Sequence, residues 1–98
     1  MLVYVPNALA PGARTDLNAR FSLSFGPSVQ RIKRLLIFDR WGSAVYEQRD
    51  AAPNDNSGAW DGTWKGDPVL PGVYPWVLEL ELVDGSRETM SGAVTVVR

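Results

Sequence analysis

Acidic side chains come nearest to a catalytic set in this chain. Four aspartates stand in polar, turn-rich stretches of the second half: Asp50, Asp55, Asp61 and Asp67. Hydrolysis by a carboxyl pair needs two such groups held about 5–9 Å apart on rigid elements, and these four lie in predicted loops without an identifiable partner. The chain has no histidine and no cysteine, which removes the usual general base, the common zinc ligands and any disulfide. The pattern therefore predicts a protein that is not an enzyme and holds no cofactor or metal.

Arginine and tryptophan are the stronger candidates, for binding rather than catalysis. Arg40 and Trp41 precede Gly42 in a predicted tight turn, and Trp64 stands in a polar context. Because Arg and Trp are enriched at binding hot spots, these three side chains are predicted as a docking patch. The structural alternative, which the sequence favours, places Trp41 over one end of the core and pairs Arg40 with a carboxylate such as Asp61. An exposed Trp64 would also suit stacking on a sugar ring.

A short basic run gives a second candidate surface. Arg31, Lys33 and Arg34 come at the start of an apolar stretch. Such a run is usually a solvated strand end, but an acidic partner surface could use it. The net charge of −1 argues against a nucleic acid as that partner.

Strand patterns must position these residues, since no window shows a helical period. Residues 74–82 alternate between an apolar and a polar face, Asp84-Gly85 is a hairpin turn, and residues 89–97 return as a closing strand. Further strand patterns cover 2–5, 21–25, 32–39 and 44–47. With 98 residues, the chain is predicted to be a single all-β domain over 1–98, an Ig-like antiparallel β-sandwich of about seven strands.

Three residues are predicted to have structural roles within that sandwich. Trp76 belongs to the apolar face of 74–82, and Gly92 marks a bulge or a close approach of another group. Trp60 is predicted to be buried beside an Asp-Gly turn. No apolar stretch reaches the roughly 20 residues of a membrane span, and the apolar run 1–5 is too short for a signal peptide.

Several separated motifs then agree on one family. The chain resembles the gliding-motility-associated C-terminal domain, the type B sorting domain of the type IX secretion system of Bacteroidetes. The matching stretches are 4–8, 35–42, 45–47, 60–62, Gly66, 71–74, 84–85 and 92–98. The motif positions, mainly structural by this resemblance, are Pro6, Asn7, Phe38, Asp39, Arg40, Trp41, Gly42, Trp60, Asp61, Gly62, Gly72, Tyr74 and Gly92.

The resemblance implies a sorting and attachment domain at the C-terminus of a larger exported protein. Proteins of the secretion machinery in the cell envelope would recognise it, and the cargo would reach the cell surface or the medium. The loop at 10–19 departs from the family, because Asp16 and Asn18 are too few oxygen ligands for the calcium that an acidic loop could hold. Two alternatives stay open, a carbohydrate-binding or adhesive module and a purely structural spacer, as does the oligomeric state.

Overall fold

Strands make up the regular structure of residues 3–10, 21, 23–53 and 60–97, which are the residues that the computed structural model describes. Four strands are long: β4 (Val29–Phe38), β5 (Ala44–Ala51), β8 (Gly72–Leu82) and β9 (Arg87–Val96). Five have two residues each: β1 (Val3–Tyr4), β2 (Ala8–Leu9), β3 (Ser24–Phe25), β6 (Thr63–Trp64) and β7 (Asp67–Pro68). No helix occurs in these residues, so the predicted all-β class is confirmed.

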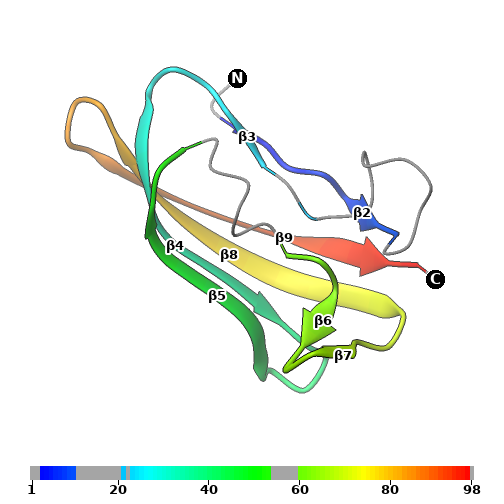
Figure 1. Ribbon diagram of the computed structural model, residues 1–98. Coiled ribbons are helices and arrows are strands. Elements are labelled where there is room, and N and C mark those ends of the chain that lie inside the picture. Colours follow the sequence, from blue (N-terminus) through cyan, green and yellow to red (C-terminus); the bar gives the residue numbers. More distant parts are fainter. Residues whose placement is uncertain (1–2, 11–20, 22, 54–59, 98) are drawn as a thin grey trace.

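A five-stranded sheet in the order β2-β9-β8-β4-β5 forms the body of the fold (Figure 1). The predicted C-terminal hairpin is confirmed, since β8 and β9 pair antiparallel from Gly72↔Val96 to Glu81↔Arg87. Its turn is held by Asp84, whose carboxylate accepts hydrogen bonds from the Ser86 hydroxyl (2.6 Å) and N–H (2.9 Å). These bonds lower the pKa of the Asp84 carboxyl.

The prediction of a wholly antiparallel sheet is wrong at one edge. β2 runs parallel to β9, with Ala8 opposite Thr95 and Leu9 opposite Val96. The sheet is therefore mixed. After β1 the chain continues as the edge strand β2, which lies beside β9 and runs in the same direction. A two-residue strand has no alternation from which this pairing could be predicted.

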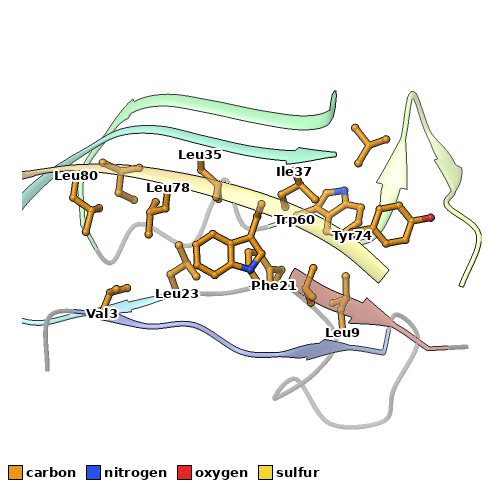
Figure 2. Close-up of a cluster of buried hydrophobic side chains, with 14 of the residues drawn as sticks. Val3, Leu9, Phe21, Leu23, Leu35, Ile37, Trp60, Tyr74, Leu78 and Leu80 are labelled. Atoms are coloured by element: carbon orange, nitrogen blue, oxygen red, sulfur yellow. The ribbon is translucent and has the colours of Figure 1, made fainter. Parts of the chain in front are cut away.

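The antiparallel pair β1–β3 lies over one face of the sheet (Figure 1), and the core fills the space between them. Figure 2 shows Val3 and Leu23 on one side of this core and Leu35, Leu78 and Leu80 on the other. Leu78 and Leu80 have no exposed surface, which confirms the predicted inward face of β8. Burying side chains of this size contributes about 1.5–3 kcal/mol each.

Gly92 is a point of close approach, as predicted, and the β8–β9 ladder has no bulge there. It lies opposite Trp76, and a Cβ on Gly92 would stand 2.7 Å from Trp76 Cζ2. The indole of Trp76 is 6% exposed and its ring lies 6.4 Å from that of Phe21. The indole N–H has no acceptor among the described residues. A side chain is therefore excluded at position 92 as long as the tryptophan keeps its place.

Two predicted segments differ from the structure. Of the described residues in the strand expected over 21–25, Ser24–Phe25 form a strand and Phe21 makes an isolated bridge to Trp60. β5 extends to Ala51, so Asp50 is in a strand rather than a loop. The expectations for Asp55 and for positions 11–19 of the altered loop, including Asp16 and Asn18, lie outside the described residues.

Candidate docking site

The turn after β4 holds Trp41 away from the core. Asp39 Oδ1 accepts hydrogen bonds from the N–H groups of Trp41 and Ser43, both 2.9 Å. Gly42 adopts φ +84°, a left-handed conformation that costs glycine little. Trp41 is 73% exposed. The interpretation of this tryptophan as a cover for the core is therefore wrong. The Asp39 hydrogen bonds fix the turn, and the Trp41 side chain points to solvent.

The β6–β7 hairpin presents a second tryptophan. Trp64 and Asp67 face each other across a two-residue turn, Lys65-Gly66, in which both residues have positive φ. This is the geometry of a type I′ turn, which suits the right-handed twist of a hairpin. Trp64 is 45% exposed, as the sequence predicts.

A buried tryptophan fixes the base of this hairpin. Trp60 is 1% exposed, and its indole N–H donates to the carbonyl of Thr63 at 3.0 Å. Asp61 Oδ1 accepts from the Thr63 N–H (3.2 Å) and hydroxyl (2.7 Å), and Gly62 has φ +82°. The predicted burial of Trp60 and the predicted Asp-Gly turn are both confirmed.

The two exposed tryptophans, Trp41 and Trp64, line the same pocket, which has a volume of about 300 Å³. The turn after β4, the start of β5, the β6–β7 hairpin and the start of β8 form its walls. Its lining, hereafter the aromatic pocket, is Asp39, Arg40, Trp41, Val45, Trp64, Lys65, Asp67, Pro68, Val69, Leu70, Val73 and Tyr74. Most of these side chains are apolar, and Leu70 and Val73 are 64% and 58% exposed.

A cation lies over each exposed indole. The Arg40 guanidinium carbon is 5.4 Å from the Trp41 ring centroid, and Lys65 Nζ is 5.3 Å from that of Trp64. Both distances are within the range of cation–π attraction. The predicted pair between Arg40 and Asp61 is wrong, because no ion pair joins them and the Asp61 carboxylate serves the Thr63 turn.

The basic run does not join this pocket. β4 carries irregularities between Val29 and Arg31 and between Ile32 and Arg34, which leave Lys33 without a partner in β8. Arg31 donates to the carbonyl of Asp50 (2.9 Å), and Lys33 forms an ion pair with its carboxylate (3.5 Å). Arg31 is seven residues from the end of β4, about 23 Å along the strand.

Arg34 lies between the positions of Arg49 on β5 and Glu79 on β8. The six residues predicted for docking therefore separate into two groups. Arg40, Trp41 and Trp64 are brought together, while Arg31 and Lys33 lie in the first half of β4 and Arg34 near its middle, all outside the pocket lining.

The other predicted motif residues lie in the strands and connections outside the exposed tryptophans. The carbonyl of Asn7 accepts from the N–H of Thr95 at 3.0 Å, which fixes β2 beside β9. The Tyr74 hydroxyl donates to the carbonyl of Leu70 at 2.5 Å, and its ring packs on Trp60 with centroids 5.5 Å apart (Figure 2). Pro6 and Phe38 are half-buried, and Gly72 has φ +151°.

The aspartates are dispersed. Asp50 pairs with Lys33, Asp61 is in a turn and Asp67 is at the rim of the aromatic pocket. No group of three or more histidine, cysteine or acidic side chains gathers in the described part of the chain. Burial raises the pKa of the Tyr46 hydroxyl, and the nearby Asp61 carboxylate raises it further. Across the described ranges, no helix is long and apolar enough to cross a membrane.

Sequence reasoning missed seven lining residues: Val45, Lys65, Asp67, Pro68, Val69, Leu70 and Val73. One of them could have been recognised from the sequence. Val73 is an apolar residue on the outward, otherwise more polar face of the 72–82 strand. The others belong to turns and short strands that come together only in the folded chain.

The family described as "CHU_C Type IX secretion signal domain" matches residues 3–96. No curated protein matches the chain.

Proposed function

The chain belongs to the CHU_C type IX secretion signal domain family, and from that premise we propose that the export machinery docks on its aromatic pocket. As a member it is a non-catalytic sorting domain that directs export across the outer membrane, to the cell surface or the medium. Its role requires recognition by the secretion machinery.

The observation that supports this surface is the large exposed apolar area at the aromatic pocket. Trp41 and Trp64 expose 73% and 45% of their surface at a pocket that also exposes Leu70 and Val73. Exposed apolar patches of this kind commonly mark interaction sites on soluble proteins. Both tryptophans stand on a fixed backbone: the turn of Trp41 is held by the Asp39 hydrogen bonds, and Trp64 is in strand β6, which is paired with β7. A partner therefore meets preformed anchors and orders little on binding.

The test is an export assay in a bacterium with a type IX system. A reporter is fused before residue 1, and its amount in the medium and on the cell surface is compared with the amount retained inside. Trp41→Ser and Trp64→Ser should each lower export at least about tenfold, since loss of a hot-spot tryptophan costs 2 kcal/mol or more.

The matched control is Tyr4→Ser, which removes an aromatic side chain that is 54% exposed outside the pocket. It should export like the wild type. Thermal unfolding of each purified domain checks that the variants still fold. Normal export of both tryptophan variants would exclude the aromatic pocket as the recognised surface.

We also propose that residues 1–98 form one unit, an Ig-like β-sandwich placed C-terminal to its cargo. The position of β1–β3 over the five-stranded sheet supports this arrangement (Figure 1). Methyl NOEs between Leu23 and Leu78 or Leu80 are expected if two layers enclose the core. A reporter fused after residue 98 should be exported less well than one fused before residue 1.

A further inference from the structure

We infer that the aromatic pocket binds an extended peptide segment in which an apolar side chain stands next to a carboxylate. The segment would belong to the envelope partner, so this inference rests on the proposed function and specifies the chemistry of its ligand. The apolar character of the pocket and the state of its charged groups each support one half of it.

The floor and walls select an apolar side chain. Besides the tryptophans, the pocket is lined by aliphatic groups from three segments: Val45, Pro68, Val69, Leu70 and Val73. Its volume of about 300 Å³ is at the lower limit for ligand sites, enough for one or two side chains. A sugar would need polar side chains directed at its hydroxyls, but Asp39 already accepts two backbone N–H groups and the Tyr74 hydroxyl already donates to the Leu70 carbonyl.

The charged groups select a carboxylate. Arg40 and Lys65 each lie over an indole, and neither forms an ion pair within the described ranges 23–53 and 60–97. Asp39 is half-buried and its carboxylate already accepts two backbone N–H groups. Asp67 is the other carboxylate of the lining. Two cations to which the described part of the chain offers no ion pair, beside an apolar pocket, favour an anionic group on the ligand.

Arg40 and Lys65 also lie close to the apolar lining of the pocket, where the apolar side chain of the ligand would bind. Each is held over the ring of its own neighbour in sequence, Arg40 over Trp41 and Lys65 over Trp64. A carboxylate that reaches them therefore belongs to a residue adjacent to the side chain in the pocket. An extended peptide provides this spacing, because its residues follow one another at about 3.3 Å along the backbone, so the neighbour of the buried residue stays at the mouth of the pocket.

The first experiment measures binding of synthetic peptides to the purified domain by isothermal titration calorimetry. The peptides carry leucine or phenylalanine followed by aspartate, asparagine or lysine. The aspartate peptides should bind at least about fivefold more tightly than the asparagine peptides at low salt. Raising the salt from about 0.05 to 0.5 M should reduce that ratio, because screening weakens exposed pairs.

Three variants test the charges. The double variant Arg40→Gln with Lys65→Gln should bring the aspartate-to-asparagine ratio to about one. Asp67→Asn should raise affinity for the aspartate peptides, since it removes a like charge. The control Arg87→Gln removes a cation from an exposed position of β9 outside the pocket. It should change neither the aspartate-to-asparagine ratio nor the affinity for the aspartate peptides.

The outcomes separate this inference from the proposed function. If Trp41→Ser blocks export while the double glutamine variant exports normally, the pocket is the docking site and the acidic ligand is wrong. If Trp41→Ser and Trp64→Ser both export normally, both proposals fail. Equal binding of aspartate and asparagine peptides, no peptide binding at all, or binding of a neutral oligosaccharide instead would each overturn the inference.

Discussion

Replacing Gly92 by alanine should destabilise the domain, because the new methyl group would enter the space of Trp76. The Cβ would stand 2.7 Å from Cζ2 and 3.0 Å from Cε2 of the indole. Carbon atoms in good contact are about 3.5–4.0 Å apart, so the overlap is about 0.8 Å at the nearer atom. The indole is 6% exposed and cannot move away without disturbing the core.

Two opposing effects set the magnitude. Overpacking of a well-filled core costs about 1–3 kcal/mol. Replacing glycine within a strand returns about 0.5–1 kcal/mol of backbone entropy. The ten residue pairs between β8 and β9 resist a backbone shift that would relieve the overlap. We therefore expect Gly92→Ala to lower the free energy of unfolding by about 1–2 kcal/mol, or Tm by about 4–15 °C.

A double-mutant cycle in urea, followed by circular dichroism, tests this origin of the cost. Trp76→Phe removes the second ring that carries Cζ2, so Gly92→Ala should be close to neutral in that background. Ser91→Ala, next in the strand on the exposed face, is the control and should change stability by less than about 0.5 kcal/mol. Equal costs of Gly92→Ala with tryptophan and with phenylalanine would refute the steric explanation.

Two further predictions concern the turn of Trp41 and the alkaline limit of stability. Asp39→Ala removes the acceptor of two backbone N–H groups and should cost about 1–2 kcal/mol in urea unfolding; a cost no larger than that of Asp67→Ala would contradict it. The pKa of Tyr46 is raised in the folded state by burial and by Asp61. Its contribution to stability is therefore complete below the unfolded value of about 10 and is lost as the pH rises from there through the folded value. Tyr46→Phe should flatten the alkaline fall in stability, and an unchanged pH profile would show that Tyr46 does not cause it.

The long strands could be predicted because their side chains alternate. The apolar face of β8 was evident from Tyr74, Trp76 and Leu78, all buried, and the Asp84-Gly85 turn fixed the register of the hairpin. Gly92 was recognisable as a close approach for a similar reason. It interrupts an alternating strand, and such an interruption needs a physical cause.

The rest depended on contacts that local patterns do not encode. The two-residue strands β2, β6 and β7 are too short to show a period, and their partners are distant in sequence or formed by a turn. The sequence favours a core position for Trp41, but a tryptophan in a turn belongs to no alternating pattern that would predict whether its side chain points inward or outward. Its exposure follows from the hydrogen bonds of Asp39. Lys65 became relevant only once the hairpin placed it over Trp64.

The parallel pairing of β2 with β9 has a consequence for how the domain reaches its native state. Thr95 N–H donates to Asn7 and Val97 N–H to Leu9, so segments nearly ninety residues apart must meet before this edge of the sheet exists. During synthesis the early segment has to wait for the late one, and closing so long a loop lowers the entropy of the chain before the contacts stabilise it. Refolding is therefore expected in milliseconds to seconds, as in other β domains with distant contacts. Refolding that is complete within microseconds in a temperature-jump fluorescence experiment would contradict this expectation.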